Sequence, residues 1–145
     1  MTSVANVHQA DKRLYTAKVR TTGGRQHGVA RSSDGYLELK LAEPGTGRAG
    51  TNPEQLLAAG WSACFESAVG IAALKRRIKL TSDPVIDAEV DLNAGDGGYF
   101  ISARLNVSIP GVDKETGLAL LRDAEGLCPY SRALKDSIDV AVNPV

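Results

Sequence analysis

Two cysteines, Cys64 and Cys128, are the residues of this 145-residue chain with the widest range of chemistry. A thiolate can attack an electrophile, bind a metal or close a disulfide, and its pKa controls its reactivity. The N-terminal segment Met1–Ala10 lacks the apolar core of a signal peptide or membrane anchor, so we expect a cytoplasmic protein. Because cytoplasmic thiols are kept reduced, we expect the two cysteines to be free, catalytic or redox-active rather than a permanent cross-link.

The surroundings of the two cysteines differ. Cys64 lies within an apolar helical segment, where a cysteine taken alone is most often a small buried hydrophobe without reactivity. Cys128 follows Gly126 and precedes Pro129, where a new helical turn can begin with proline at its first position. The dipole at the start of a helix stabilises a thiolate, so this position favours a reactive role for Cys128.

Other chemistries have weaker support in the sequence. His8 and His27 could join the cysteines at a zinc ion, but no pair of ligands has the spacing of a zinc site, so we expect no metal. Gly23–Arg25 lacks the glycine pattern of a nucleotide-binding loop, and we expect no helix to follow it. Ser62 lacks the flanking glycines of a hydrolase nucleophile.

Two further possibilities for a protein with two cysteines differ in what they require of these residues. Disulfide reductases and isomerases place their cysteines two residues apart at a helix start, whereas 64 positions separate the pair here. A small dimeric protein that binds a ligand or an acyl carrier needs only buried, inert cysteines. This non-enzymatic alternative predicts no turnover at the cysteines.

Short alternating segments and turn residues predict a β-meander at the start of the chain. The expected strands are Leu14–Arg20, Val29–Ser32 and Tyr36–Leu41, with a compact hairpin turn at Ser33–Gly35. The segment Ala42–Gly50 is too rich in glycine and proline for regular structure, so we expect a loop there.

A long helix follows this loop. Thr51 and Asn52 can cap it, Pro53 fits its first turn, and Glu54 suits its positive end, so the helix is predicted over Pro53–Lys75. The expected elements after it are strands Val85–Leu92 and Phe100–Ile109 around a turn at Asn93–Gly98, a helix at Asp113–Leu127 and a strand at Ile138–Val142. This order predicts an α+β fold in a single domain over residues 1–145.

The charge balance limits the partners of the protein. Seventeen basic and seventeen acidic side chains give a formal net charge of zero, which removes the field that binding to a nucleic-acid backbone requires. The apolar stretch Leu56–Leu74 contains Trp61, Ser62, Glu66 and Ser67, so we expect a buried helix rather than a membrane span.

Four separated motifs, taken together, carry a resemblance to a known family. They are Thr-Gly-Gly-Arg at Thr22–Arg25, Thr-Asn-Pro-Glu-Gln-Leu at Thr51–Leu56, Ala-Ala-Gly-x-x-Ala-Cys-Phe at Ala58–Phe65, and Cys-Pro-Tyr-Ser at Cys128–Ser131. In this order the motifs resemble the organic hydroperoxide resistance (Ohr) branch of the OsmC/Ohr family, and the resemblance extends from about Leu14 to Val142.

The resemblance implies a fold, an activity and site residues. The implied fold is an intertwined α+β homodimer, with antiparallel sheets packed around a long central helix and with active sites at the subunit interface. In the implied reaction Cys64 is the peroxidatic cysteine that reduces organic hydroperoxides, Cys128 is the resolving cysteine, and Arg25 and Glu54 organise the thiolate. The implied reductant is a dithiol such as lipoyl groups on a protein, and no cofactor is implied.

Elementary chemistry agrees with these roles. A thiolate that cleaves an O–O bond needs a depressed pKa and a nearby cation, which Arg25 can supply while Glu54 holds its guanidinium in a bidentate pair. Without the motifs, Arg25 would be a solvated turn residue and Glu54 a helix-start acid. Apolar neighbours suit alkyl or fatty-acid hydroperoxides better than hydrogen peroxide; the expected ones are Leu56, Leu57, Trp61, Ala63 and Phe65.

The spacing of Glu54 and Cys64 sets a geometric condition. Ten residues of continuous helix span about 15 Å, with side chains rotated by roughly 280°, so the two side chains cannot meet one guanidinium along a straight helix. Either the helix is interrupted at Gly60, or the Arg25–Glu54 pair at a given Cys64 comes partly from the other subunit. We favour the shared site.

Overall fold

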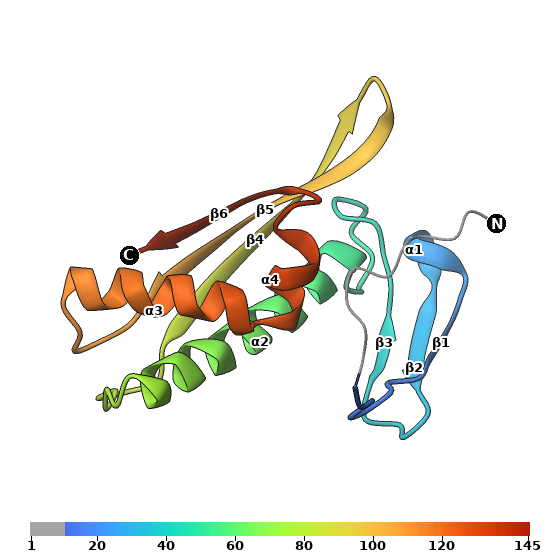
Figure 1. Ribbon diagram of the computed structural model, residues 1–145. Coiled ribbons are helices and arrows are strands. Elements are labelled where there is room, and N and C mark those ends of the chain that lie inside the picture. The colour runs from blue at the N-terminus through green and yellow to red at the C-terminus, as the bar shows by residue number, and fades with distance from the viewer. Residues whose placement is uncertain (1–10) are drawn as a thin grey trace. The chain divides into compact units, whose positions relative to one another are not determined.

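The computed structural model describes residues 11–145, which divide into two compact units (Figure 1). The first unit ends at Asn52, and the second runs from Pro53 to Val145. Each unit is described by itself, and the expectation of a single domain stays a prediction. The segment Met1–Ala10, from which we expected no signal peptide, lies outside the described residues.

The first unit holds a three-stranded antiparallel sheet in the order β1-β2-β3. The strands are β1 (Val19–Thr22), β2 (Val29–Ser32) and β3 (Glu38–Lys40), so the second predicted strand is confirmed, the third is shorter, and the first begins later than Leu14. The prediction that no helix follows the glycine pair was wrong. Gly23, with its left-handed φ of 84°, lets the chain turn into one helical turn, α1 (Gly24–His27).

The predicted turn between β2 and β3 is confirmed, and its own side chains hold it. The Ser32 hydroxyl donates to Asp34 Oδ1 at 2.6 Å, and the Tyr36 backbone N–H donates to the same oxygen at 3.0 Å. These hydrogen bonds, that of Ser32 first, lower the pKa of Asp34 below its ordinary value. An aspartate that accepts bonds from residues two positions away is typical of a tight turn.

Helix α2 (Pro53–Lys75) opens the second unit and has the bounds that the sequence predicted. It is continuous, so the interruption considered at Gly60 does not occur. One face of α2 is buried in the core of the unit, through Trp61, Phe65, Ala68, Val69, Ala72 and Ala73. By length and apolar composition alone α2 could cross a membrane, a test that the core helix of a soluble protein also passes.

The sheet of the second unit has the order β4-β5-β6. Strands β4 (Val85–Gly95) and β5 (Gly98–Ser108) form the predicted antiparallel hairpin, but they pair as far as Gly95 and Gly98. The turn is therefore tighter than Asn93–Gly98. Strand β6 (Asp139–Pro144) pairs with β5 in parallel, which corrects the expectation of purely antiparallel sheets. The two helices between β5 and β6 return the chain to the end of the sheet where β5 begins. Strand β6 therefore runs beside β5 in the same direction (Figure 1).

These two helices are α3 (Lys114–Leu127) and α4 (Pro129–Leu134). The Asp113 side chain caps α3 by accepting the Thr116 N–H at 2.8 Å. The predicted helix over Asp113–Leu127 is therefore confirmed, with Asp113 as its cap. The buried faces of α2, α3 and β5 meet in one core; its members outside α2 include Ala103, Leu105, Val107, Leu121, Ala124 and Cys128. The α+β class is confirmed, and this core fixes the position of both cysteines.

Candidate active site

The second unit brings both cysteines against the same hydrophobic core. Cys64 projects from α2 and is half-buried, whereas Cys128, at the junction of α3 and α4, is fully buried. Both are free thiols. A small molecule can therefore reach Cys64 but not Cys128, and this asymmetry is what an attacking thiol and a resolving thiol need.

Backbone hydrogen bonds fix Cys128 at the point where one helix ends and the next begins. The Cys128 N–H donates to the Ala124 carbonyl at 2.8 Å and closes α3, while the Cys128 carbonyl accepts the Arg132 N–H at 3.0 Å and opens α4. Pro129 occupies the first position of α4, as predicted, because that position needs no amide donor. The backbone of Cys128 is thus held by both helices.

Helix α4 lies against α2 through two contacts beside the cysteines. The Trp61 indole Nε1–H donates to Ser131 Oγ at 2.9 Å, and both residues are buried. At Gly60 a side chain would have no room, because a Cβ there would lie 2.6 Å from Tyr130 Oη. The sequence placed these residues inside recognised motifs but did not show that the two motifs touch each other.

The electrostatics of Cys64 within this unit oppose reactivity. Burial raises the pKa of the Cys64 thiol above its ordinary value, and the neighbouring Cys128 raises it further. Both thiols also pack against the same hydrophobic cluster. A reactive thiolate needs the opposite shift, which a cation beside the sulfur would produce.

The two other predicted site residues lie in different units. Arg25 lies in α1 of the first unit, and Glu54 lies in the first turn of α2. Glu54 and Cys64 thus share one unbroken helix, ten residues apart. The association of Arg25 and Glu54 with the Cys64 sulfur stays a prediction.

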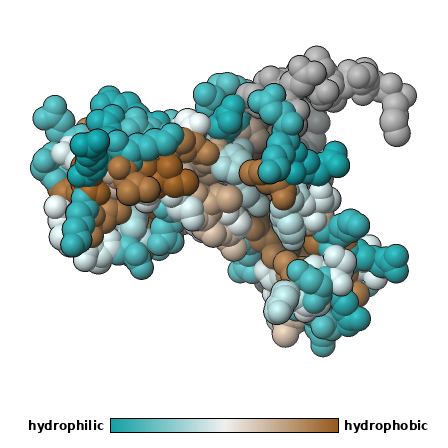
Figure 2. All heavy atoms as spheres, turned by 60° about the horizontal axis from the view of Figure 1, so that its bottom comes forward, coloured by the Kyte–Doolittle hydropathy of each residue, from teal (hydrophilic) through white to brown (hydrophobic). Residues whose placement is uncertain are grey.

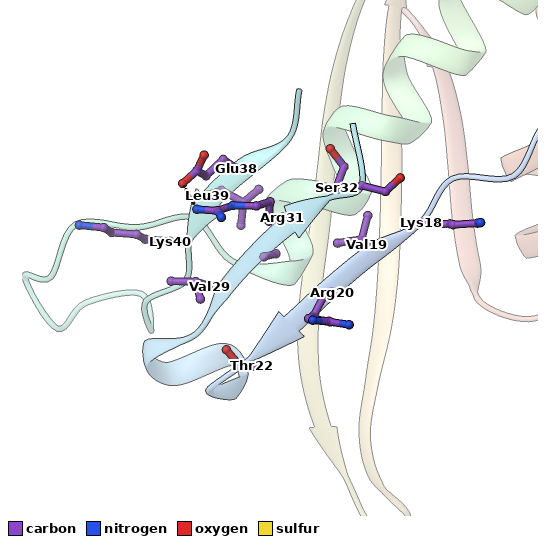
Figure 3. A pocket seen from close by; sticks show the side chains of 12 residues that line it. Lys18, Val19, Arg20, Thr22, Val29, Arg31, Ser32, Glu38, Leu39 and Lys40 are labelled. Atoms are coloured by element: carbon purple, nitrogen blue, oxygen red, sulfur yellow. Dashed lines mark hydrogen bonds and ion pairs between the residues drawn. The ribbon is translucent and has the colours of Figure 1, made fainter. Parts of the chain in front are cut away.

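A hollow of about 930 Å³ lies against the sheet of the first unit, as Figure 3 shows. Side chains of β1, β2 and β3 line it, among them the cations Arg20 and Lys40 and the Arg31–Glu38 ion pair, together with Lys18 just before β1. Neither cysteine and neither Arg25 nor Glu54 lines it, so it is not the predicted site. Among residues 11–145 no group of three or more histidine, cysteine or acidic side chains is placed to hold a metal, and His8 lies outside that range.

Residues 45–143 match the model of the OsmC-like protein family, which is more than half of the chain. The chain belongs to the OsmC-like protein family. It is 43% identical to an organic hydroperoxide resistance protein of Xanthomonas axonopodis pv. citri over 136 residues, which cover 91% of this chain and 95% of the relative. It is 42% identical to the organic hydroperoxide resistance protein OhrA of Bacillus subtilis, with 89% and 94% covered.

A solved structure agrees with the sequence relatives. The crystal structure of the organic hydroperoxide resistance protein OhrB of Bacillus subtilis superimposes with a TM-score of 0.85 at 38% identity, covering 92% of this chain and all of that one. The resemblance drawn from the four motifs is confirmed, and with it the α+β fold of this OsmC-like protein.

Proposed function

We propose that this OsmC-like protein is a cytoplasmic thiol peroxidase that detoxifies organic hydroperoxides. The observation that carries the proposal is the pair of free thiols in one core, Cys64 half-buried and Cys128 fully buried. The relatives named for organic hydroperoxide resistance support the substrate class. No cofactor is needed, because the two sulfur atoms carry the redox change themselves.

The proposed reaction has three steps. The Cys64 thiolate attacks the terminal oxygen of the hydroperoxide, an S–O bond forms as the O–O bond breaks, and the alkoxide takes up a proton to leave as the alcohol. The Cys128 thiolate then attacks Cys64 Sγ, the S–S bond replaces the S–O bond, and hydroxide leaves as water. A dithiol, which we propose to be lipoyl groups on a protein, reduces the disulfide and is itself oxidised.

In this proposal Arg25 supplies the cation that activates Cys64. Burial and Cys128 both raise the Cys64 pKa, and a guanidinium beside the sulfur would lower it again. Glu54 would hold the guanidinium in place by a bidentate ion pair. Glu54 and Cys64 of one chain cannot both contact the same guanidinium, because α2 is continuous and the ten residues between them span about 15 Å.

A homodimer would resolve this geometry by bringing Arg25 and Glu54 of a partner to Cys64. Figure 2 shows a hydrophobic band over the second unit, at the left of that view. On α2 an exposed row of apolar and small residues recurs at helical spacing and is left uncovered by the chain itself; it comprises Leu56, Ala59, Ala63, Ser67, Gly70 and Leu74. Small side chains let a second α2 approach closely, which supports a second copy of this chain as the partner.

The apolar surroundings favour organic over inorganic peroxides. Leu57 and Tyr130 are half-buried beside the core that Trp61 and Phe65 fill. Because Trp61 and Phe65 are completely buried, they support the site from beneath, and the more exposed Leu56 and Ala63 are the neighbours that a substrate would touch. An alkyl chain gains from such contacts, whereas hydrogen peroxide gains little.

The cysteine roles are tested by the variants Cys64→Ser and Cys128→Ser. Cys64→Ser should abolish consumption of cumene hydroperoxide, with dihydrolipoamide as the reductant. Cys128→Ser should keep the first oxidation and leave Cys64 as sulfenic acid or a higher oxide in the mass spectrum. Equal loss of the first oxidation in both variants would contradict the assignment, and so would a wild type that forms no Cys64–Cys128 disulfide after one equivalent of peroxide.

The shared site is tested by mixing chains. Co-refolding Cys64→Ser chains with Glu54→Ala chains should regenerate about one sound site per heterodimer, because the Glu54→Ala chain keeps its thiol and borrows its partner's carboxylate. The same mixture made with Cys64→Ser,Glu54→Ala chains in place of the single Cys64→Ser variant is the matched control, and it should stay inactive. A mixture no more active than the sum of its parents would place Glu54 and Cys64 of one chain in the same site.

A further inference from the structure

Two of the sequence motifs contact each other through residues that take no part in the bond-making steps above. Gly60 and Trp61 of one motif lie against Tyr130 and Ser131 of the other. The Trp61–Ser131 hydrogen bond and the Gly60–Tyr130 contact join the two helices that carry the cysteines. The two hydrogen-bonded residues are equally far along the chain from their cysteines. Trp61 lies three residues before Cys64, and Ser131 three residues after the second cysteine, so each bonded residue is about one helical turn from a sulfur.

Disulfide closure is sensitive to the relative placement of these helices. A disulfide needs an S–S distance near 2.05 Å and Cα atoms about 4.4–6.8 Å apart. Cys64 and Cys128 are far apart in sequence and lie on different helices, so the packing of α4 on α2 decides whether the sulfurs can meet. Chain connectivity alone does not hold them together.

The hydrogen bond can serve this purpose because it is buried and directional. Trp61 has no exposed surface, and Ser131 is 3% exposed, so water does not compete for the indole N–H or the serine oxygen. A buried donor that loses its partner is left unsatisfied, which favours the paired arrangement strongly. Packing alone would tolerate a small slide of α4 along α2, whereas a directional hydrogen bond does not.

We propose that Trp61 and Ser131 are positioning residues that hold Cys128 ready to close the disulfide with Cys64. This inference rests on the proposed peroxidase function and concerns its second step. The first step uses the Cys64 thiolate, the groups that activate it and the hydroperoxide, but not Cys128. In the second step the Cys128 thiolate attacks Cys64 Sγ, the S–S bond forms as the S–O bond breaks, and hydroxide leaves to become water. Loosening α4 slows this step and leaves the sulfenic acid exposed to a second peroxide molecule.

The test compares Trp61→Phe, Ser131→Ala and the double variant with the wild type in rapid-mixing experiments. Oxidation of Cys64 should keep its rate within about twofold, while disulfide formation slows by about tenfold, the factor that corresponds to one lost buried hydrogen bond. Under excess peroxide the Cys64 sulfinic acid should increase in the mass spectrum of each variant. The double variant should be no slower than the slower single variant, because both remove the same bond.

A matched control removes a serine hydroxyl elsewhere in the second unit. Ser102 Oγ accepts from Asn93 Nδ2 at 3.0 Å and donates to Asp91 Oδ2 at 2.8 Å on the sheet, so Ser102→Ala also removes hydrogen bonds but leaves both rates unchanged. Equal slowing by Ser102→Ala, or unchanged disulfide formation in both Trp61→Phe and Ser131→Ala, would overturn the proposal. So would additive effects in the double variant.

A second measurement separates this inference from the peroxidase function. In a glutathione redox buffer without peroxide, the equilibrium between the Cys64–Cys128 dithiol and its disulfide reports how well the two thiols are positioned. The disulfide should be about tenfold less favoured in Ser131→Ala than in the wild type. A protein inert to organic hydroperoxides that still shows this difference would refute the peroxidase function and keep the positioning role. An unchanged equilibrium would refute the positioning role.

Discussion

Replacing Gly60 by alanine tests how tightly α4 packs on α2. In a helix interior alanine is favoured over glycine by about 1 kcal/mol, so the substitution taken alone should stabilise α2. The contacts at Gly60 predict the opposite effect on stability. The new Cβ would lie 2.6 Å from Tyr130 Oη and 3.1 Å from Tyr130 Cζ, and a separation below 3.0 Å requires the tyrosine to move.

The expected magnitude follows from these two opposing effects. Forcing an extra methyl group into a packed interface costs about 1–3 kcal/mol, which exceeds the propensity gain. Tyr130 is half-buried and follows Pro129, whose fixed φ limits how the α4 start can adjust. We therefore expect Gly60→Ala to lower the free energy of unfolding by up to about 2 kcal/mol.

Chemical denaturation of the reduced protein measures this change, with Gly117→Ala as the matched control. A Cβ at Gly117 in α3 would meet Val112 Cγ2 at 3.7 Å, which is an ordinary contact, so this variant should gain up to about 1 kcal/mol. Gly60→Ala should also slow disulfide formation, because Tyr130 is adjacent to Ser131. If Gly60→Ala gains as much stability as Gly117→Ala, the contact between Gly60 and Tyr130 is not tight and the argument fails.

Three further substitutions test the charges and the backbone. Arg25→Ala should raise the pKa of Cys64 and lower the thiolate fraction at neutral pH, and identical thiolate absorbance titrations of variant and wild type would remove Arg25 from the mechanism. Arg77, two residues after the end of α2, has a left-handed φ of 58°, so Arg77→Gly should raise the free energy of unfolding by about 1 kcal/mol; an unchanged denaturation midpoint would show that the position is unstrained. Hydrogen bonds from Arg104 and then Ser102 lower the pKa of Asp91 from 3.8 to about 2, so this carboxylate stabilises the protein above pH 3.8 and the contribution is lost as the pH falls toward 2. Asp91→Asn should therefore be less stable than the wild type near neutral pH, with a difference that shrinks over this acid range, and a difference independent of pH would refute the assignment.

The sequence predicted the second unit better than the first for a physical reason. Helix α2 has cap, proline and acid signals at its start and a basic end, and its bounds matched. The short strands of the first unit carry little periodicity, so the start of β1 was misplaced. The single helical turn α1 depends on the left-handed Gly23, a conformation that composition does not reveal.

The parallel pairing of β6 could not be predicted from its residues. Val140 and Val142 alternate with polar residues as in any half-buried strand, and this pattern is the same in both directions. Direction is set by α3 and α4, which return the chain across the sheet. Likewise, the motif residues Trp61 and Ser131 were recognised separately, but their hydrogen bond joins positions 70 residues apart and depends on how α4 folds back on α2.

The position of Cys64 in the core of its unit works against its reactivity. The core that brings Cys64 next to Cys128 is apolar, and burial in that core raises the Cys64 pKa. Because the thiolate is disfavoured in the folded protein, the free energy of unfolding should fall as the pH rises from the ordinary pKa of a thiol through the raised pKa of Cys64. The apolar core that brings the two cysteines together therefore also raises the Cys64 pKa, whereas activation of Cys64 needs a lowered pKa. In the proposed mechanism the guanidinium of Arg25 would satisfy both, because it would stabilise the thiolate without opening the core in which the two cysteines lie.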